Sequence, residues 1–376
     1  MKIAVLTWFD NMNYGTVLQL HALCDYLGET FSADVDVINY KPSDAHAVSK
    51  TETLSDRLFY RLSQALKKNL APAPAASVLF PKEEETKKLR FESFLGGLSF
   101  TEPVSETDEL EKLSENYDLF VCGSDQIWNP RILNRVFYLD FVKNTPKLSY
   151  ATSMGIGYIP RYAEKYIKDY LKDFRAVSLR EDSCKARLET ICGKEVSVVC
   201  DPTLLLSAEK WGALADSAEF VGSGYTFTYF LGSSENHKEI NREVLSLLGK
   251  KAYTTAPSYD YSDLIGAEET AFGPLEFLSA VKNSDFVLTD SFHAVCFCII
   301  FEVPFCVVFK HSESDPFNQN GRITFLLEKL SLSDRIARGK EDVERIINTG
   351  VDYKSVKEKL DEFIKESAAY LDKNIY

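Results

Sequence analysis

The stretch from Phe286 to Phe309, FVLTDSFHAVCFCIIFEVPFCVVF, constrains the fold more than any other part of the chain. Its first four residues predict a buried strand, and Asp290 and Ser291 predict a tight polar turn. An apolar helix is expected to open at His293, and a second strand follows within Val303–Phe309. A strand, a helix and a strand in this order form the repeating unit of a parallel sheet, so we expect an α/β protein.

The rest of the chain alternates strands and helices in the same way. Residues 1–40 predict a βαβ unit, with strands at Lys2–Thr7 and Val35–Asn39 and a helix over Gly15–Leu27. Further strands are predicted at Asp118–Cys122, Lys147–Ala151, Ala176–Ser178, Val196–Cys200, Tyr225–Phe230 and Ala252–Thr255, and further helices at 51–69, Arg161–Phe174, Asp182–Ile191, His237–Leu248, Gly273–Lys282, Arg322–Leu330 and Tyr353–Leu371.

This alternation predicts two doubly wound, Rossmann-like α/β domains that face a cleft. We place an N-terminal domain at residues 1–205 and a C-terminal domain at residues 206–352. A final helix, residues 353–376, is expected to pack back on the N-terminal domain. Residues 71–85, APAPAASVLFPKEEE, break the pattern and predict a long excursion, either a plain surface linker or a lid.

Composition excludes several classes of function. The net charge of −13 argues against broad nucleic-acid binding, although a few arginines in a cleft would still bind a small anion. No apolar run reaches the roughly 18 residues of a membrane span, and the N-terminus does not resemble a signal peptide. The eight cysteines form no CxxC pair and predict buried free thiols in a reducing cytoplasm. The five histidines lack HExxH spacing, so no metal site is predicted.

Polar residues follow several predicted strands directly, at the edge where open α/β sheets bind ligands. His293 comes after Asp290 and Ser291 at the end of one strand, which makes it a candidate functional histidine rather than a helix cap or a core group. Asn13 and Gly15 begin the first helix, whose N-terminus suits a phosphate or a carboxylate. An ordinary capped turn is the alternative there, and no GxGxxG is present.

Three further strand ends carry candidates. In VCGSDQIWNP, the three consecutive polar side chains of Ser124, Asp125 and Gln126 are more than a turn needs, which favours a functional role. Trp128 is either the floor of a sugar site or a core residue. In AVSLRED, Arg180 would clamp a carboxylate or a phosphate, or else form a surface ion pair with its acidic neighbours. In CDPTLLL, the Asp-Pro pair at position 201 is interpreted as a structural hinge turn.

The motifs NYGTVLQ, GSDQIWNP, SLRED, CDPTLLL, GPLEFL and DSFHAVCFCIIFEVPF, in this order, resemble the polysaccharide pyruvyl transferase family. The resemblance runs from Lys2 to about Arg335. It implies a fold similar to the glycosyltransferase-B type. It also implies transfer of a pyruvyl group from phosphoenolpyruvate to two hydroxyls of a sugar, which forms a cyclic ketal and needs no further cofactor.

The resemblance also implies roles for the candidate residues. Arg180 would hold the donor, His293 would act as acid–base group or phosphate ligand, and Asp125 or Asp290 would accept a proton from the attacking hydroxyl. Ser291 stands where some members carry an arginine, so the missing cation must come from elsewhere. Donor-binding candidates are Arg180, Ser291, His293 and, as the replacement cation, Arg322; acceptor-binding candidates are Asn13, Tyr14, Gly15, Ser124, Gln126 and Trp128.

The N-terminal domain would then serve the acceptor and the C-terminal domain the donor. The expected acceptor is a sugar or a lipid-linked oligosaccharide, a precursor of a surface polysaccharide or capsule, so membrane contact would be peripheral and made through the acceptor. Two other readings remain open. One is a nucleotide-sugar-dependent glycosyltransferase of the same fold, and the other is a non-catalytic glycan-binding protein.

Overall fold

The computed structural model describes residues 1–42, 46, 81–220, 222–232, 234–255, 266–313, 315 and 318–376. The helix predicted over 51–69 lies outside these residues, as does the part of the predicted excursion before position 81. For the rest of that excursion, residues 81–85, the prediction is wrong, because Pro81 begins the helix α3 (Pro81–Leu95). Proline is favoured in the first turn of a helix, and Glu83 and Glu84 complement the positive end of its dipole.

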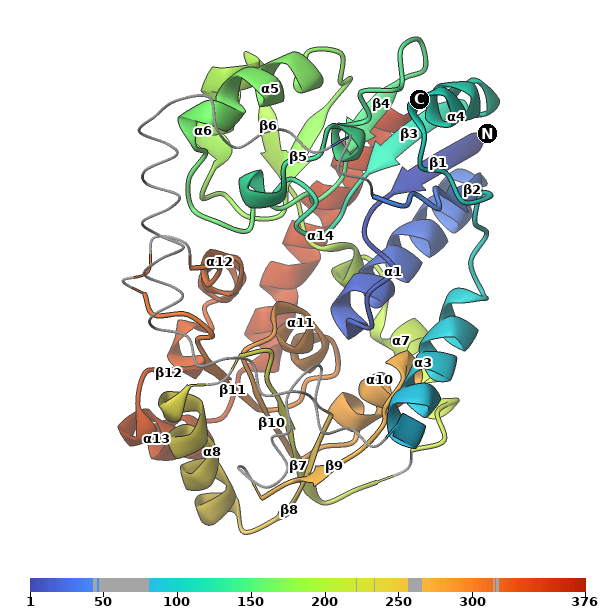
Figure 1. Ribbon diagram of the computed structural model, residues 1–376. Coiled ribbons are helices and arrows are strands. Elements are labelled where there is room, and N and C mark those ends of the chain that lie inside the picture. The colour runs from blue at the N-terminus through green and yellow to red at the C-terminus, as the bar shows by residue number, and fades with distance from the viewer. Residues whose placement is uncertain are drawn as a thin grey trace.

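The N-terminal half is built on parallel strands, shown in the upper part of Figure 1. The strands are β1 (Lys2–Leu6), β2 (Asp34–Val37), β3 (Leu119–Cys122), β4 (Lys147–Ser149), β5 (Val177–Leu179) and β6 (Val196–Val198). The order is β2-β1-β3-β4, and single bridges from Leu148 to Ala176 and from Thr152 to Leu179 continue it into the β5-β6 pair. Because the chain leaves β1 in opposite directions toward β2 and β3, this sheet has a topological switch point between β1 and β3.

The C-terminal half contains a second parallel sheet, in the lower part of Figure 1. Its strands are β7 (Tyr225–Tyr229), β8 (Lys251–Thr254), β9 (Glu268–Glu269), β10 (Phe286–Thr289), β11 (Phe305–Val308) and β12 (Ile336–Ala337). Their order, β12-β11-β10-β7-β8-β9, is that of the Rossmann fold, with its switch point between β7 and β10. The predicted architecture of two Rossmann-like α/β units is confirmed.

Helices connect the strands in both halves. In the N-terminal half they are α1 (Tyr14–Phe31), α3, α4 (Thr107–Leu113), α5 (Arg161–Leu171) and α6 (Lys185–Cys192). The C-terminal half has α7 (Ala208–Asp216), α8 (Glu235–Leu248), α10 (Pro274–Lys282), α11 (Phe292–Ile300), α12 (Gly321–Lys329), α13 (Val343–Asn348) and α14 (Tyr353–Ile375). Helix α11 begins one residue earlier than predicted, because the Ser291 hydroxyl caps it by accepting from the Ala294 amide.

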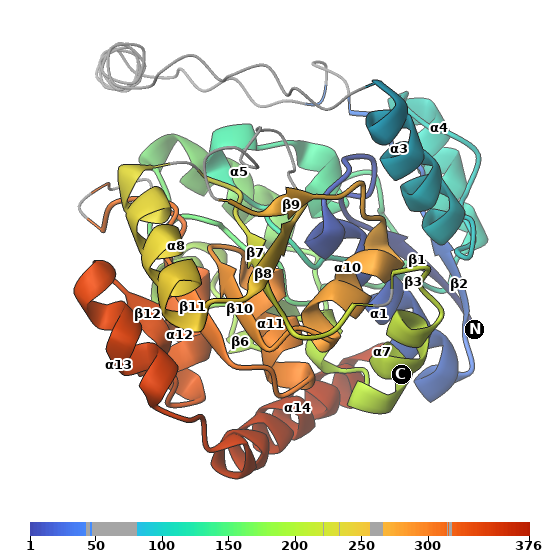
Figure 2. The same ribbon diagram turned by 90° about the horizontal axis from the view of Figure 1, so that it is seen from below.

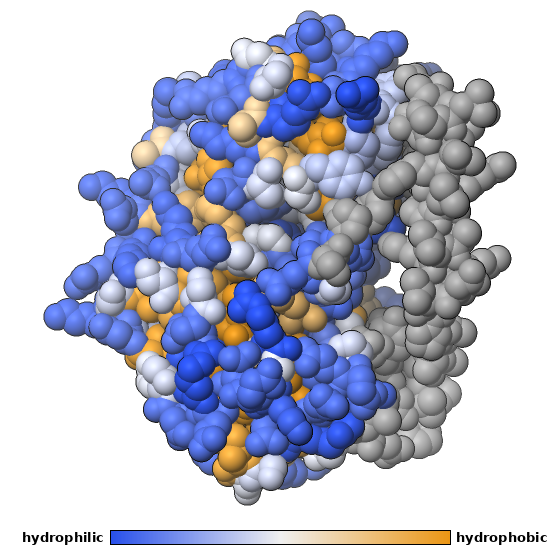
Figure 3. All heavy atoms as spheres, turned by 90° about the vertical axis from the view of Figure 1, so that its left-hand side faces the viewer, coloured by the Kyte–Doolittle hydropathy of each residue, from blue (hydrophilic) through white to orange (hydrophobic). Residues whose placement is uncertain are grey.

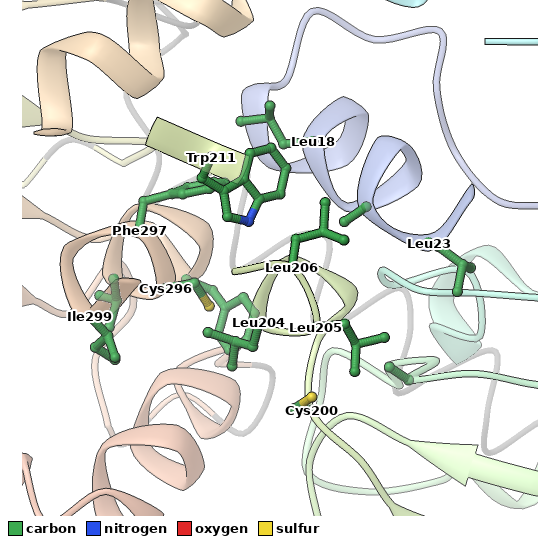
Figure 4. Packing of buried hydrophobic residues seen from close by; sticks show 14 of the residues in the cluster. Leu18, Leu23, Cys200, Leu204, Leu205, Leu206, Trp211, Cys296, Phe297 and Ile299 are labelled. Carbon is green, nitrogen blue, oxygen red and sulfur yellow. The ribbon is translucent and has the colours of Figure 1, made fainter. Parts of the chain in front are cut away.

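A single hydrophobic cluster joins the two halves. Figure 4 shows Leu18 of α1, Leu204 of the turn after β6, Trp211 of α7 and Phe297 of α11 packed together. The rings of Trp211 and Phe297 meet edge to face with centroids 5.0 Å apart, and the indole donates to the Thr203 carbonyl at 2.9 Å. A shared, well-packed core of this kind limits movement between the halves, so the loops that face each other across it are held in register.

The last helix, α14, runs from the C-terminal half to the N-terminal half, where both chain termini lie (Figures 1 and 2). The Tyr370 hydroxyl donates to the Ser149 carbonyl at 2.8 Å, and the Ser367 hydroxyl accepts from the Cys200 amide at 2.8 Å. These contacts tie α14 to β4 and to the segment after β6. The division of the chain at residue 205 stays a prediction. Among the described residues, no helix has the length and hydropathy of a membrane span.

Candidate functional site

The carboxyl ends of the two sheets face each other across a cleft of about 880 Å³. The N-terminal half contributes the loops after β1 and β3, and the C-terminal half contributes residues after β7, β10 and β11 and the start of α12. The lining includes Trp8, Asn13, Thr16, Asp125, Gln126, Asn129, Arg131, Asp290, Ser291, Phe292, His293, Lys310, Gln319 and Arg322. The cleft therefore lies where both topological switch points meet, which is the usual ligand position in such folds.

Arg180 occupies the centre of a buried charge cluster behind the cleft. Its side chain is 1% exposed, and Nη1 donates to Oδ2 of Asp201 at 2.6 Å. Asp125 and Glu181 lie slightly farther away, at 3.7 Å and 3.9 Å from Nη2 and Nε. The guanidinium also stacks over the Phe292 ring, 4.4 Å from its centroid. Burial alone would lower the pKa of Arg180, but the three carboxylates raise it above its ordinary value, so the residue is a permanent cation.

His293 connects this cluster to the cleft. Its Nε2 lies 3.5 Å from Oδ2 of Asp201 and 3.4 Å from Nη1 of Arg180, while the ring also lines the cleft. Burial would raise the pKa of Asp201, but His293 and Arg180 hold it far below its ordinary range. The other side of the ring packs on the backbone of Gly15, where a Cβ atom would lie 1.9 Å from Nδ1. The imidazole is therefore fixed from both sides, with one face toward the cleft.

Asp125 is the carboxylate that the cleft exposes beside His293. The Thr16 hydroxyl donates to its Oδ2 at 2.8 Å. Burial would raise the pKa of Asp125, but Arg180, His293, the Thr16 hydroxyl and Arg322 together lower it below its ordinary value. The group is thus ionised at neutral pH and can accept a proton from a bound hydroxyl.

The Asp290 carboxylate accepts hydrogen bonds from the backbone with both of its oxygens. Its two carboxylate oxygens accept from the amides of Leu231 and Gly232, at 2.6 Å and 2.8 Å. Nε2 of His237 lies 3.3 Å from Oδ2. With both oxygens used in this way, Asp290 holds the loop after β7 against the cleft, which fits a general base less well than the position of Asp125 does.

Among the residues that the structure describes, three Arg or Lys side chains line the cleft itself. Arg322 comes from the start of α12, and its guanidinium lies 3.4 Å from both the carbonyl and the side-chain oxygen of Gln319. In the amide orientation that satisfies both partners, Oε1 of Gln126 accepts from the same guanidinium at 3.0 Å and 3.3 Å. Lys310 follows β11, and Arg131 lies on the opposite wall. Within the described part of the chain, neither Arg322 nor Lys310 forms an ion pair with a carboxylate.

The surroundings of Arg322 and Lys310 lower the pKa of both side chains. Burial and the neighbouring charge of Arg180 lower the pKa of Arg322 to about 10. Desolvation by the cleft walls also lowers the pKa of Lys310, with Arg322 adding to the effect and Asp290 opposing it. Desolvation is the largest cause of both shifts, and nearby carboxylates oppose it only in part, so both cations are held away from water, as in a site that binds an anion.

The structure corrects the prediction for Arg180. The side chain does not line the cleft, because three carboxylates surround it. It is better described as a positioning residue behind His293. By contrast Arg322, the replacement cation, does line the cleft, as do Ser291, Asn13 and Gln126.

Two aromatic candidates for acceptor binding also lie outside the cleft. The Trp128 ring is fully buried, stacks on Tyr138 with centroids 5.0 Å apart and donates to the Phe137 carbonyl at 3.0 Å. The Tyr14 ring is equally buried, and its hydroxyl contacts the side chain of Thr255 at 2.7 Å. Trp128 is therefore a core residue, and Tyr14 joins the two halves of the molecule.

The small candidates Gly15 and Ser124 are buried rather than exposed to a ligand. Gly15 provides the close contact with His293 described above. The Ser124 hydroxyl lies 2.7 Å from the Ala151 carbonyl and 3.2 Å from Oδ2 of Asp201. Both support the site from behind.

Sequence reasoning missed Asp201 and Lys310. Asp201 was interpreted as part of a hinge turn, and its carboxylate does accept from the Thr203 amide at 3.0 Å in such a turn. Its position at the end of β6 was a signal for a functional role, by the same rule that selected Arg180 after β5. Lys310 lies two residues after the end of β11 and could have been found in the same way. Within the described ranges, no group of three or more His, Cys, Asp or Glu side chains is arranged to hold a metal ion.

A family model described as polysaccharide pyruvyl transferase matches residues 13–311 of the chain. This span includes most of the cleft lining, but not Trp8 and residues 10–12 after β1 or residues 319–323 around the start of α12. No curated protein matches the sequence significantly.

Several solved structures are similar to this one. UDP-GlcNAc 2-epimerase from Methanocaldococcus jannaschii has a TM-score of 0.49 at 13% identity, covering 94% of this chain and 93% of its own. The Neisseria meningitidis enzyme bound to UDP-GlcNAc gives 0.46 and 13%, covering 98% and 94%. UGT2 from Phytolacca americana, complexed with UDP-2-fluoro-glucose and pterostilbene, gives 0.44 and 11%, covering 98% and 94%. The two strand orders identify the fold of both halves without these similarities.

Proposed function

The chain belongs to the polysaccharide pyruvyl transferase family, and on that premise we propose that it moves the pyruvyl group of phosphoenolpyruvate onto two hydroxyls of a sugar. The product is a cyclic ketal, and phosphate is released. The acceptor is a precursor of a surface polysaccharide.

The observation that carries this proposal is a pair of cations in the cleft, Arg322 and Lys310, that form no ion pair with a described carboxylate. Phosphoenolpyruvate bears a carboxylate and a phosphate, so its site must supply positive charge at two places. Arg322 has a planar guanidinium that matches a carboxylate, and Lys310 supplies a compact charge for a phosphate. The two residues begin α12 and follow β11, so they approach the cleft from one half of the molecule and leave the opposite wall for the acceptor.

The reaction balances in two additions. Protonation of the methylene carbon of the enol makes a methyl group and leaves an oxocarbenium-like carbon, which the first sugar hydroxyl attacks with loss of its proton. The bond from this carbon to the phosphate oxygen then breaks, and the second hydroxyl attacks and loses its own proton. One of the two hydroxyl protons restores the acid that protonated the methylene carbon, and the other is taken up by phosphate or solvent.

The residues at the cleft fit these steps. His293 is the acid that protonates the methylene carbon, since it is the titratable group fixed between the charge cluster and the cleft. Asp125, ionised and facing the same space, accepts the proton of the attacking hydroxyl. Asp201 and Arg180 position the imidazole from behind. The amides of Asn13 and Asn129 and the Trp8 ring offer hydrogen bonds and an apolar face to the acceptor on the opposite wall.

Ligand-dependent thermal stability tests the choice of donor. We expect phosphoenolpyruvate to raise the melting temperature of the wild-type protein, since a ligand that binds only the folded state stabilises it. A panel of nucleotide sugars serves as the comparison, and stabilisation by one of these alone would favour the glycosyltransferase reading. His293→Ala should retain its fold and its response to phosphoenolpyruvate but lose phosphate release in the presence of an acceptor.

A further inference from the structure

Two smaller cavities continue the central cleft around the beginning of α12. The first, about 170 Å³, meets the cleft at Arg322, which lines both. The second, about 300 Å³, shares Ser183, Asn318 and Gly321 with the first and Asn320 with the cleft. We call the two cavities together the side groove. Its walls come from the loop after β4 (residues 155–158), from the residues after β5 and from α12, so it lies between the two halves.

The charge of the lining changes where the cleft passes into the side groove. Arg322 stands at the junction, and beyond it the described lining residues include no other cation. Asp182 and Glu328 line the groove as carboxyl groups, whereas Glu181 pairs with the buried Arg180 at 3.9 Å and Glu313 pairs with Arg338 at 3.1 Å. Such a lining repels phosphate and other anions, which the central cleft attracts.

The groove also offers an unused hydrogen-bond acceptor. Glu181 is 3% exposed, and its Oε1 accepts from the Ser153 hydroxyl at 2.7 Å. Its Oε2 lies 3.9 Å from Nε of Arg180 but accepts no hydrogen bond from the described residues, and burial raises the pKa of this carboxyl although Arg180 opposes the shift. A buried polar atom without a partner is costly, so a hydroxyl group from a ligand would relieve it. The lining further includes the Asn318 amide and the half-buried rings of Tyr158 and Phe325.

Beyond Arg322 at the junction, the carboxyl groups, amides and aromatic faces of the described lining form a surface for an uncharged, hydroxyl-rich ligand. We infer that the side groove binds neutral sugar residues of the acceptor, next to the sugar that receives the pyruvyl group. The first cavity has the volume of about six water molecules at ~30 Å³ each, which is enough for a single sugar ring. The inference rests on the proposed function, because the groove leads away from the proposed pyruvyl site. A diphosphate end of the acceptor would leave the cleft by another route.

Figure 3 looks onto the side of the molecule that carries α5, α6 and α12 in Figure 1. The surface there is mostly hydrophilic with small hydrophobic areas, as a sugar-binding face requires. Ser183 is exposed and lines both cavities of the groove, so a bulky residue at this position would fill it without disturbing the core.

Hydrogen exchange of the full chain tests the side groove with named sugars. Maltotriose, cellotriose and mannotriose are neutral probes, and trigalacturonate is the anionic comparison. We expect at least one neutral trisaccharide to slow exchange within residues 155–158 and 318–325, by about tenfold at ten times its dissociation constant. Trigalacturonate should have no such effect. Ser183→Trp should abolish the protection, and Ser246→Trp, a control at an exposed position of α8, should retain it.

The inference is overturned if none of the neutral trisaccharides protects these residues, if trigalacturonate protects them equally, or if protection survives in Ser183→Trp. Phosphoenolpyruvate forms a separate arm of the same experiment and should protect the segments around His293 and Lys310. If phosphoenolpyruvate alone gives no protection, the proposed function is contradicted. If the trisaccharides alone give none, the role of the side groove is contradicted.

Discussion

Arg180 and Asp201 form a buried ion pair, with Nη1 of the guanidinium 2.6 Å from Oδ2 of the carboxylate. The same two atoms lie 3.4 Å and 3.5 Å from Nε2 of His293. The pair therefore joins the ends of β5 and β6 in one half to the start of α11 in the other. Through it the N-terminal half sets the position of the histidine that the C-terminal half supplies.

Replacing Asp201 by Asn should destabilise the protein strongly. The substitution keeps the shape but leaves the buried Arg180 without its closest counter-charge, and breaking a buried pair costs about 3–5 kcal/mol. Urea unfolding measures the loss. Asp285→Asn is the matched control, because Asp285 forms an exposed pair with Lys250 and should change stability by ~0.5 kcal/mol at most. Equal effects of the two substitutions would contradict the role of Asp201.

The stabilising effect of Asp201 should depend on pH in a defined direction. The folded protein holds the pKa of Asp201 below its unfolded value of about 3.9, so the effect is complete above that pH and is lost as the pH falls through the folded value. The difference in unfolding free energy between wild type and Asp201→Asn should thus be constant from pH 5 to 7 and shrink below about pH 4. A difference that grows on acidification would have the wrong sign.

Arg322→Ala should weaken the binding of phosphoenolpyruvate without unfolding the protein. A hydrogen bond to a charged group is worth about 1.5–3 kcal/mol, which corresponds to roughly a tenfold to hundredfold rise in the Michaelis constant. Steady-state kinetics and circular dichroism measure the two effects. Arg242→Ala removes an exposed arginine of α8 that pairs with Glu235, and its kinetics should match those of wild type. Arg180→Ala should instead lose stability, since it removes a buried counter-charge rather than a ligand.

The affinity for phosphoenolpyruvate should fall in alkaline solution. The pKa of Arg322 is lowered to about 10, and its positive charge is present below that value and lost above it. Binding that needs this charge should weaken by about tenfold for each pH unit above the pKa. Titrations between pH 7 and 10.5, limited to the range in which circular dichroism shows a folded protein, would reveal the decline. A constant affinity over that range would speak against Arg322 as a donor ligand.

Gly15→Ala should disturb the site through the contact with His293. A Cβ atom at this position would lie 1.9 Å from Nδ1 of the imidazole, so the ring must move. We expect a large drop in kcat and a loss of about 1–3 kcal/mol in stability. Gly28→Ala in the same helix is the control, because the nearest atom to its Cβ would be the Ala33 carbonyl oxygen at 3.7 Å, an ordinary contact. That variant should keep full activity and gain up to about 1 kcal/mol.

Much of the site could be predicted because parallel sheets gather their ligand-binding residues at one edge. Asp125, Ser291 and His293 each follow a strand in the sequence, and all three line the cleft. A position directly after a strand predicts the edge of the sheet at which a residue lies, but not how deeply its side chain is buried. Arg180 follows β5 in the same way, yet Asp125 and Asp201, both distant in the sequence, enclose it together with its neighbour Glu181. Which partner a charged residue meets depends on tertiary packing.

The direction of side chains in a turn, as for Trp128, and at the first residue of a helix, as for Tyr14, was the other source of error. Trp128 and Tyr14 stand next to residues that line the cleft, but both point into the core. Regular strands and helices have a period from which a buried face can be inferred, and turns do not. Likewise, the need for glycine at position 15 comes from a ring nearly 280 residues later in the chain, and no local pattern reveals it.

Calorimetric titration of phosphoenolpyruvate into wild type and Arg322→Ala tests the central claim most directly, because it needs no knowledge of the acceptor. The account predicts one binding site in the wild-type protein and an affinity at least about tenfold lower in the variant. Absence of binding to the folded wild-type protein, or equal affinity in the two proteins, would contradict it.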